Sequence, residues 1–470
     1  MINANSVSLK PRIAILGGGI SGLSTAFWIS EMLPRADITL IESQSRCGGV
    51  IGTLAMDGNL LEKGPLAFPA GAPATGEILR KTKVESKCIS SAQAKSIGLW
   101  NGKRLMSFPR TPWTFLHSRL LSPYGLVRLL AEPFMPRVNH SEDETVLEFF
   151  RRRTGQEFLE CFMEPFAVGV LSGDPATMSM SANLPAFHAM EKKSGSLAAG
   201  FWKKILSAWI KRAEIRFGIS GMVTTPSGSE GVIEALVEKL RERKIRFLLS
   251  HKITSVIQED AYQVAWESET GKGLEAFDGI VSCLPSYVLA PLCASWPIII
   301  CELMRDIPHA PLVLSHLAIK KLQPSHSFKG DGFLVQCQAS EGILSGFFPS
   351  RISPKRCPED FELLRVMLGG ARHPEIKGLT EEVIQQVSTQ AVQKILRPVG
   401  LIKSFPVIRH ERGLPQLVIG HAKKVADLRN WFRENMPGFV IAGTSFQGAG
   451  IENAIVSGKT AAREITLIFQ

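Results

Sequence analysis

The N-terminal part of the chain has an apolar pattern that changes twice. Arg12–Leu16 is a short apolar run that ends directly at glycines, and residues 23–33 then place apolar side chains at helical spacing. Residues 36–42 (ADITLIE) alternate between apolar and polar side chains and end on an acid. This order of strand, glycine turn, helix and strand predicts a βαβ unit.

The middle of the chain has two different patterns. From residue 105 to 217, apolar side chains recur at spacings of three and four with arginines between them, which predicts a mostly helical region. Residues 231–243 predict a further helix, and residues 246–282 predict strands. From residue 308 to 370, strand-like runs alternate with turns, which predicts an antiparallel sheet.

The C-terminal part repeats the arrangement of the N-terminal part. PGFVIAGTS (437–445) predicts a strand, and IENAIVSGKTAAREI (451–465) predicts a helix after a glycine-rich turn. Because each end carries a strand, glycines and a helix, we expect the two ends to share one sheet. The predicted fold class is α/β: a discontinuous Rossmann-like domain, joined to an α+β domain with an antiparallel sheet and a mostly helical insertion.

Composition and charge narrow the classes of function. Hydrophobic residues make up 45% of the 470 residues and charged residues 21%, which is typical of a globular protein. The net charge of +11 allows nucleic acid, an anionic membrane surface or an acidic substrate as a partner. The basic residues are spread along the chain without zinc-finger spacing, so we expect no nucleic-acid partner. The 8 cysteines form no C-x-x-C pair, so we expect a reducing compartment and no metal site.

The sequence shows no pattern of a targeting peptide or of a membrane span. The segment before Ile13 is short and polar, and the apolar run 288–304 is interrupted by Pro291, Pro297 and Glu302. We therefore expect a cytoplasmic bacterial protein. The helical region combines apolar faces with flanking basic residues, which leaves peripheral binding to the inner membrane open against plain core packing.

The glycines after the first strand form a G-x-G-x-x-G pattern at Gly17, Gly19 and Gly22. The first permits a tight turn, the second lets the backbone approach a pyrophosphate, and the third lets the helix pack on the strand. Helix N-terminal N–H groups then point at the phosphates, with Gly18, Ile20 and Ser21 in the same turn. Glu42 ends the next strand, where a carboxylate accepts hydrogen bonds from ribose hydroxyls. The alternative is a tight turn with an unrelated acid.

Two further segments extend this pattern. Arg46 follows Glu42 and Ser43 at a spacing of four from the acid, and Gly48, Gly49 and Val50 come next. The combination resembles the extended fingerprint of the FAD-binding amine-oxidase and phytoene-desaturase superfamily. In that superfamily an E-x-G-P segment lies beside the flavin ring, which implies the same for Gly64, Pro65, Leu66 and Ala67; the alternative is a turn that closes the domain. The resemblance also implies Ile253 as a cofactor contact.

A series of segments in the middle of the chain narrows the family further. LLAEPFMPR (129–137), EPFAVGVLSGDPATMSMSANLP (164–185), VMLGGARHPEI (366–376) and GLPQLVIGH (413–421) resemble, in order, the oxygen-dependent, FAD-containing protoporphyrinogen oxidase family. Each segment alone is compatible with a structural role, and their joint order carries the resemblance.

The resemblance implies a reaction and a substrate pocket. A porphyrinogen would lose six electrons in three two-electron steps, each passing a hydride from a ring carbon to flavin N5, with oxygen or another acceptor reoxidising the flavin. No dedicated catalytic acid or base is required. The pocket residues carried over from the family are Leu334, Phe347, Met367 and Gly169. Ordinary core positions are the alternative for each of them.

The position that carries an arginine for a substrate propionate in many family members is Ser96 here. Lys95 or Arg104 could take that role, although strand alternation points Lys95 to the opposite face from residue 96. The choice between protoporphyrinogen and coproporphyrinogen therefore stays open. A carotenoid desaturase, an amine oxidase and a non-catalytic FAD scaffold are further alternatives, although only 3 tyrosines argue against an aromatic amine cage.

The glycine-rich segment 443–458 resembles the closing segment of the same family. Its helix N-terminus would stabilise the reduced flavin at the N1–C2=O edge, through Thr444, Ala449, Gly450 and Ile451. We therefore expect an FAD-binding domain formed by residues 1–88, 218–292 and 431–470. A helical insertion would span residues 89–180, and a substrate-binding domain 181–217 and 293–430. The resemblance alone is also compatible with a homodimer.

Overall fold

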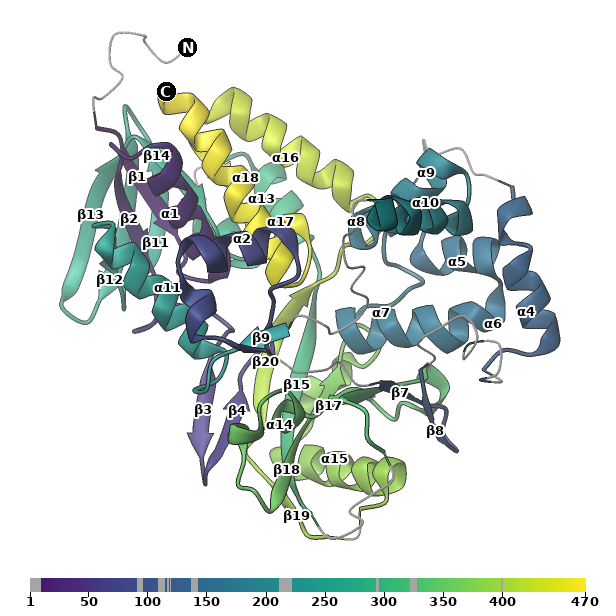
Figure 1. Cartoon of the computed structure of the whole chain (residues 1–470). Coiled ribbons are helices and arrows are strands. Elements are labelled where there is room, and N and C mark those ends of the chain that lie inside the picture. Colours follow the sequence, from purple (N-terminus) through teal and green to yellow (C-terminus); the bar gives the residue numbers. More distant parts are fainter. Residues whose placement is uncertain are drawn as a thin grey trace.

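The computed structural model of the protein has three regions. Figure 1 shows a parallel sheet with its helices, a group of helices beside it, and a second sheet below. The described residues are 10–90, 96–108, 115, 118, 120–136, 143–210, 222–292, 296–321, 328–398 and 400–470.

The first region contains a parallel sheet to which both ends of the chain contribute. Its strand order is β10, β2, β1, β14, β21, and every neighbouring pair is parallel. The strands are β1 (Arg12–Leu16), β2 (Asp37–Ile41), β10 (Arg246–Leu248), β14 (Gly279–Ser282) and β21 (Phe439–Ile441). The expectation that the two ends share one sheet is therefore confirmed.

Helices cover both faces of the parallel sheet. One face carries α1 (Ile20–Met32), α2 (Pro73–Lys81), α11 (Glu230–Glu242) and α18 (Ile451–Phe469). The other packs against β11 (Lys252–Gln258), β12 (Tyr262–Ser268) and β13 (Gly271–Phe277), and against α12 (Ser286–Leu292), α13 (Ile298–Arg305) and α16 (His421–Asn435).

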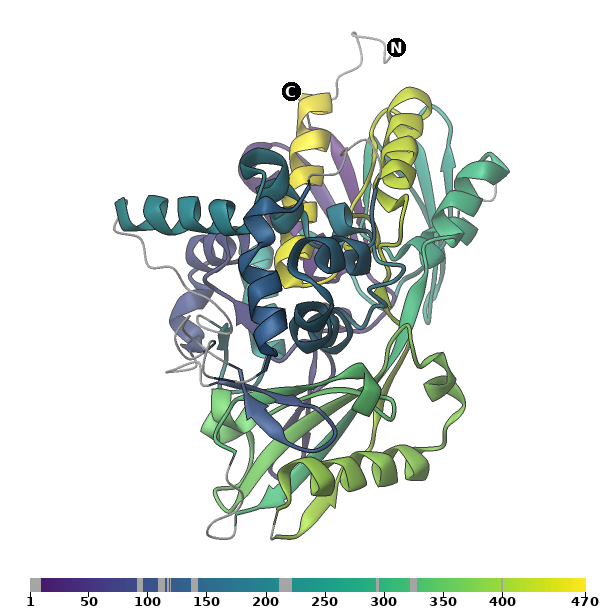
Figure 2. The ribbon, with the colours of Figure 1, turned by 90° about the vertical axis from the view of Figure 1, so that its right-hand side faces the viewer.

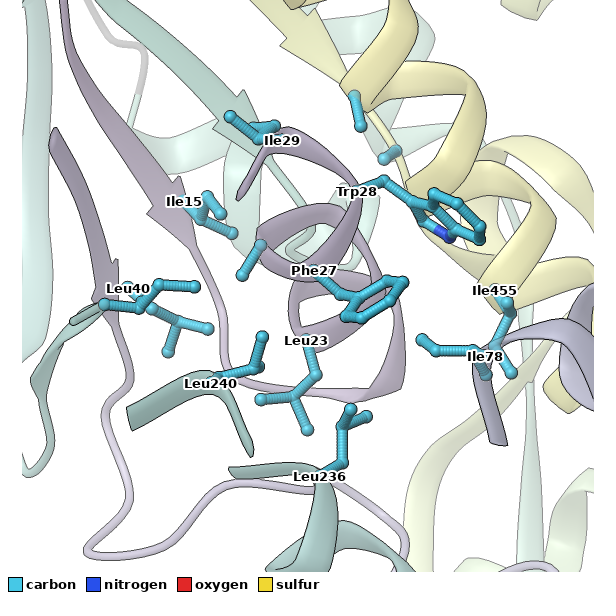
Figure 3. Packing of buried hydrophobic residues seen from close by; sticks show 14 of the residues in the cluster. Ile15, Leu23, Phe27, Trp28, Ile29, Leu40, Ile78, Leu236, Leu240 and Ile455 are labelled. Carbon is cyan, nitrogen blue, oxygen red and sulfur yellow. The ribbon is translucent and has the colours of Figure 1, made fainter. Parts of the chain in front are cut away.

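The core on the first face explains why α1 is apolar around most of its circumference. Figure 3 shows Phe27 and Trp28 of α1 directed toward Ile455 of α18 and Ile78 of α2, while Leu23 meets α11. Helices α1 and α18 approach closely because Gly458 has no side chain: a Cβ there would lie 2.5 Å from the Ser21 carbonyl oxygen. The N-terminal and C-terminal helices are thus one packing unit.

The second region is a mixed, mainly antiparallel eight-stranded sheet. Along β19, β15, β18, β17, β16, β7 and β8 only β16 and β7 are parallel, and β20 pairs with β15. The bounds are β7 (Ile97–Trp100), β8 (Leu105–Ser107), β15 (His309–Lys320), β16 (Gly332–Val335), β17 (Ile343–Phe347), β18 (Phe361–Gly369), β19 (Ile402–Ser404) and β20 (Ile408–Pro415). Helix α15 (Glu381–Leu396) covers one face through Ile384 and Val392. The opposite face carries the residues predicted to contact the substrate.

Helices form the third region. They are α4 (Pro123–Leu130), α5 (Val146–Thr154), α6 (Gln156–Phe158), the π-helical turn η3 (Leu159–Met163), α7 (Glu164–Leu171), α8 (Met180–Asn183), α9 (Pro185–Ser194) and α10 (Leu197–Ile210), with the 3₁₀ turn η2 (Glu132–Phe134). Figure 2, seen from this side, shows the blue and teal helices in front of the parallel-sheet region and above the green sheet.

The sequence-based boundary of the helical insertion needs a correction. Residues 97–107 lie within the predicted insertion 89–180, yet they form β7 and β8 of the large sheet. The segment after Ser96 was expected to be a strand, but which sheet a short strand such as Ile97–Trp100 joins is decided by its partner, here β16. Likewise α8 to α10, which fall partly in the predicted substrate domain, pack with α4 to α7.

Small elements connect these regions. A hairpin consists of β3 (Thr53–Met56) and β4 (Asn59–Glu62), and a three-stranded sheet of β5 (Phe68–Pro69), β9 (Met222–Thr224) and β6 (Ile89–Ser90). The remaining short helices are η1 (Val84–Lys87), η4 (Cys337–Ala339), α14 (Pro349–Ile352), η5 (Pro354–Arg356), η6 (Pro374–Gly378) and α17 (Thr444–Gln447).

Candidate cofactor and substrate site

The turn between β1 and α1 has the shape that its glycines predict. The N–H of Gly17 donates to the Ile41 carbonyl over 2.8 Å, and Gly17 has a φ of +99°. A Cβ at Gly22 would lie 1.9 Å from the Gly17 carbonyl oxygen, so the turn can close only on glycine. No atom lies within 4 Å of a Cβ built at Gly19, the residue that precedes α1, and no side chain caps this helix. The first N–H groups of α1, at Ile20 and Ser21, therefore lack a side-chain cap among the described residues.

Glu42 is fixed at the end of β2 and is nearly buried. Its carboxylate accepts hydrogen bonds from the Gly18 N–H over 2.7 Å, the Gln44 N–H over 2.9 Å and the Ser43 hydroxyl over 3.1 Å. Each carboxylate oxygen has two lone pairs, so capacity for a further donor remains. The backbone N–H of His251 donates to the Glu42 carbonyl over 2.9 Å, and Ile253, two residues further along on β11, is buried in the core.

Arg46 shapes the second glycine turn. Its guanidinium donates to the carbonyls of Ile51 over 2.8 Å and Gly49 over 3.0 Å, and lies 3.5 Å from Glu230. The Gly48 N–H in turn donates to the Gly18 carbonyl over 2.8 Å. Gly49 has a φ of +58° and faces Gly19, which brings the two glycine turns together with Val50 half exposed beside them. The structure thus gives Arg46 a role in folding the loop.

The C-terminal glycine turn lies at the same edge of the parallel sheet. Because β1 and β21 are parallel within one sheet, α1 and the α17–α18 pair begin at the same edge. The N–H of Gly443 donates to the Ser457 hydroxyl over 2.9 Å, and Thr444 begins α17. Gly450 precedes α18 with a φ of +105°, no side-chain cap and no atom within 4 Å of its virtual Cβ. Ala449 and Ile451 flank it.

These residues fit an FAD. Two long helices, α1 and α18, present uncapped N-termini next to bare glycine backbone, which is the donor set that phosphates and an electron-rich ring edge require. A fixed carboxylate, Glu42, stands at the end of β2 for a ribose.

The segment after β4 lies between the glycine turns and the large sheet. A Cβ at Gly64 would lie 2.3 Å from the Val50 carbonyl oxygen, so Gly64 packs directly on the second glycine turn. Arg365 of β18 donates a hydrogen bond to the Gly64 carbonyl, and Arg356 donates to the Leu66 carbonyl over 3.0 Å. Pro65 and Ala67 belong to the same stretch, which we call the cofactor loop (residues 62–67).

The predicted substrate residues share one face of the large sheet. Leu334 and Met367 both pair with Ser345 in register, and Phe347 pairs with Arg365. Strand alternation therefore places Leu334, Phe347 and Met367 on one face, opposite the face that α15 covers. Phe347 and Met367 are only partly buried, although their chain neighbours in β17 and β18 are buried.

Gly169 of α7 lies on this face. A Cβ there would come within 2.8 Å of the Leu334 side chain and 2.9 Å of the Leu344 carbonyl oxygen. The expectation that Gly169 offers its backbone to a pyrrole nitrogen meets a competing bond, because the Ser345 hydroxyl donates to the Gly169 carbonyl over 2.9 Å. Lys95 lies outside the described residues. Arg104 is exposed in the β7–β8 turn, and the Ser96 carbonyl accepts from the Asp331 N–H over 3.0 Å.

Two arginines that sequence reasoning did not assign organise this region. Arg372 lies 2.6 Å from Glu164, at the start of α7, and 2.9 Å from Asp174, so it ties the EPF and GDP segments to the end of β18. Arg365 is buried in the middle of β18, in the apolar part of the strand that follows Glu362. A charged residue inside the apolar run LLRVML (363–368) was the signal that could have singled it out.

Comparisons with known proteins show which family the chain belongs to. The family model of the flavin-containing amine oxidoreductases matches residues 20–466. Coproporphyrinogen III oxidase of Bacillus subtilis is 25% identical and covers 98% of this chain and 99% of its own length. Protoporphyrinogen oxidase 2 of Arabidopsis thaliana is 24% identical over 96% of this chain and 93% of its own length.

Among solved structures, an Exiguobacterium protein provisionally assigned as a protoporphyrinogen oxidase superposes with a TM-score of 0.79 at 24% identity. The match covers 98% of this chain and 99% of that chain. It supports the fold, including the parallel and antiparallel sheets. The chain therefore belongs to the flavin-containing amine oxidoreductase family and is an FAD-dependent oxidoreductase.

Proposed function

We propose that this protein oxidises protoporphyrinogen IX to protoporphyrin IX, with the loss of six electrons. Relatives that span nearly the whole chain carry the names of porphyrinogen oxidases, which favours a porphyrinogen as substrate. The observation that carries the proposal is the sheet face with Leu334, Phe347 and Met367, joined through Arg365 to the cofactor loop.

This face suits a large, flat and apolar tetrapyrrole. Its predicted contacts are apolar, and two of them, Phe347 and Met367, keep part of their surface free. Met367 is flexible and polarizable, so it can adapt to a ring edge. Gly169 keeps α7 close to the sheet, which would confine the ligand to the part of the face nearer the cofactor loop.

The FAD would be held by the two glycine turns, Glu42 and the start of α18, within the proposed FAD-binding domain of residues 1–88, 218–292 and 431–470. Bound FAD supplies the acceptor for a hydride, and molecular oxygen or another acceptor takes the electrons on. The contribution of the protein is to orient the substrate and exclude water. No side chain is assigned as a catalytic acid or base, since formation of an aromatic ring drives the oxidation.

Coproporphyrinogen III is the second candidate substrate. The Bacillus subtilis relative, at 25% identity, and the Staphylococcus aureus relative, at 23%, are both named coproporphyrinogen III oxidases. The two porphyrinogens differ in their number of propionates. The recognition of carboxylates therefore decides between them, and Ser96 cannot form the paired bonds that an arginine makes.

The test is a direct comparison of the two porphyrinogens. Each is mixed anaerobically with the purified FAD-loaded enzyme, and the loss of the oxidised flavin absorbance is followed. Oxygen is then admitted, so that the flavin can be reoxidised for the remaining two-electron steps, and porphyrin fluorescence is recorded. We expect protoporphyrinogen IX to reduce the FAD faster than coproporphyrinogen III and to give porphyrin; faster reduction by coproporphyrinogen III would assign that substrate instead. If neither porphyrinogen reduces the bound FAD, the proposal fails.

We also propose that the helical region binds peripherally to an anionic membrane surface, from which an apolar substrate could enter. Helix α4 and η2 expose apolar side chains on one side, and Trp202 on α10 is 69% exposed next to the exposed Lys203. The exposed fractions are 75% for Tyr124, 65% for Val127, 69% for Leu130 and 85% for Phe134. In the part of the chain that the structure describes, no helix combines the length and apolarity needed to cross a bilayer.

A further inference from the structure

A cluster of buried ionisable side chains lies where the cofactor loop meets the large sheet. Glu62 and Arg356 are fully buried and lie 2.8 Å apart. Arg365 of β18 is 9% exposed, and His316 of β15 is fully buried opposite it in register. The cluster therefore joins the end of β4, the turn before β18, and two strands of the substrate sheet.

The charges in this cluster do not cancel. The Glu62 carboxylate is occupied by Arg356, by the Ser229 N–H over 2.9 Å and by the Thr53 hydroxyl over 3.0 Å. Arg365 makes no ion pair with any residue that the structure describes. Burial lowers the pKa of Arg365 to about 10, with Glu62 opposing and Arg356 reinforcing that change, so the guanidinium stays charged at neutral pH.

His316 does not alter this balance. Burial, together with the nearby Arg365 and Arg356, lowers the pKa of His316 to about 3. It is therefore neutral at physiological pH, and neither ring nitrogen has a hydrogen-bond partner among the described residues. Within the cluster one carboxylate, Glu62, faces two guanidinium groups and is paired with Arg356, so one buried positive charge, on Arg365, is in excess. Such a charge is costly unless an anionic group comes near it.

Arg365 stands at the junction of the two halves of the site. Its guanidinium donates to the Gly64 carbonyl of the cofactor loop, which packs on Val50 of the second glycine turn. Its backbone pairs with Phe347 on the predicted substrate face. The residues that would hold the cofactor and those that would hold the substrate are thus connected through this one side chain.

We propose that Arg365 is a positioning residue that holds the cofactor loop against the substrate sheet and whose buried charge stabilises the anionic, reduced form of the bound FAD. The inference rests on the proposed placement of the cofactor loop beside the flavin ring. The charge would act through the low dielectric of the buried junction, and reduction, which adds negative charge, would supply the missing countercharge.

The measurement that tests it is the two-electron midpoint potential of bound FAD, obtained by chemical or photochemical reduction without any porphyrinogen. We expect Arg365→Met and Arg365→Gln to shift the potential to a more negative value, and Arg365→Lys to stay close to wild type because it keeps the charge. If the Met variant does not retain FAD, the Gln variant decides the question, and loss of FAD from all three would overturn the electrostatic role. This experiment needs no substrate, so its failure is distinct from failure of the proposed oxidation.

Arg351→Met is the matched control. Arg351 is also an arginine of the substrate sheet region that donates to backbone carbonyls, but it is paired with Glu362 at 3.0 Å and lies away from the cofactor loop. We expect the control to lower the thermal midpoint of unfolding without moving the potential. An unchanged potential in FAD-loaded Arg365→Met, or an equal shift in the control, would overturn the inference. A raised KM for porphyrinogen at unchanged potential would instead assign Arg365 to a substrate carboxylate.

Discussion

The Ser345 hydroxyl donates a hydrogen bond of 2.9 Å to the carbonyl of Gly169, and both residues are buried. This bond joins α7, which precedes the GDP segment, to the centre of the sheet that carries the predicted substrate contacts. Arg372 adds a second connection by pairing with Glu164 and Asp174. The family-like segments in the helical region therefore have a structural role: they place α7 over the substrate face.

Gly169→Ala is expected to disturb this arrangement. The added methyl group would lie 2.8 Å from the Leu334 side chain and 2.9 Å from the Leu344 carbonyl oxygen, so α7 must move away from the sheet. We expect a loss of about 1–3 kcal/mol in stability and a fall in porphyrinogen turnover, with FAD content unchanged. Gly378→Ala is the control, since no atom lies within 4 Å of its virtual Cβ. Equal turnover in both variants would contradict the packing role.

The start of α18 can be tested against another helix of similar geometry. Gly450 and Gly420 both precede a long helix, both have a positive φ, and neither has an atom near its virtual Cβ. Gly450→Ala should weaken FAD binding at least tenfold, about 1.4 kcal/mol, because a methyl group would enter the space before the uncapped helix N-terminus. Gly420→Ala should carry a similar backbone cost and leave FAD binding intact. The dissociation constant of FAD is measured for both variants by reconstitution of the apoprotein. Equal dissociation constants would argue against a contact between FAD and the start of α18.

Glu132 is expected to dominate the stability of the helical region. Its carboxylate accepts from the N–H groups of Leu197 over 2.8 Å and Ala198 over 3.1 Å, and it pairs with the fully buried Arg153. Glu132→Gln removes one of the two carboxylates that face Arg153, the other being Glu191 at 3.4 Å, so we expect a loss of about 1–3 kcal/mol. Glu411→Gln, at an exposed position, should change stability by no more than about 0.5 kcal/mol. Urea denaturation gives the free energy of unfolding of both variants. If Glu132→Gln loses no more stability than Glu411→Gln, the buried pair is unimportant.

His316 should make the protein sensitive to mild acid. Its pKa falls from about 6.5 when unfolded to about 3 when folded, so the unfolded chain binds the proton first as the pH drops. The stability contribution is complete above pH 6.5 and decreases as the pH falls from there toward 3. Between pH 7 and pH 5 this residue alone should cost about 2 kcal/mol. His316→Leu should lose stability less steeply over this interval, and parallel curves for variant and wild type would refute the assignment.

The exposed apolar residues of the helical region predict binding to lipid. A double variant, Phe134→Ser with Trp202→Ser, should reduce co-flotation with vesicles that contain anionic lipid. Leu467→Ser is the control, because Leu467 is 75% exposed but lies on α18, outside the helical region. Wild-type protein that does not float with such vesicles would exclude the proposed membrane role.

The sequence by itself determined the local elements and the chemistry that depends on backbone conformation. The glycines at 17, 19 and 22 predict a tight turn, and the structure shows why glycine is required at two of them: Gly17 has a positive φ, and Gly22 packs against the Gly17 carbonyl. The apolar pattern of residues 23–33 predicts a helix, and the run LLRVML (363–368) a strand, since these periodicities are local; the structure has a helix at Ile20–Met32 and a strand at Phe361–Gly369. The C-terminal glycines could likewise be compared with a cofactor-binding segment, because their pattern is local in the sequence.

Only the tertiary structure decided which distant segments meet. Strand β7 joins the large sheet because β16 offers it a partner, and the pattern of Ile97–Trp100 contains no information about that partner. The pairing of Arg365 with the Gly64 carbonyl joins residues that are 301 positions apart, and the charge balance around it depends on Glu62 and Arg356 being buried together. Burial and long-range contacts are properties of the folded chain, so the electrostatics of this junction could not be derived from the order of residues alone.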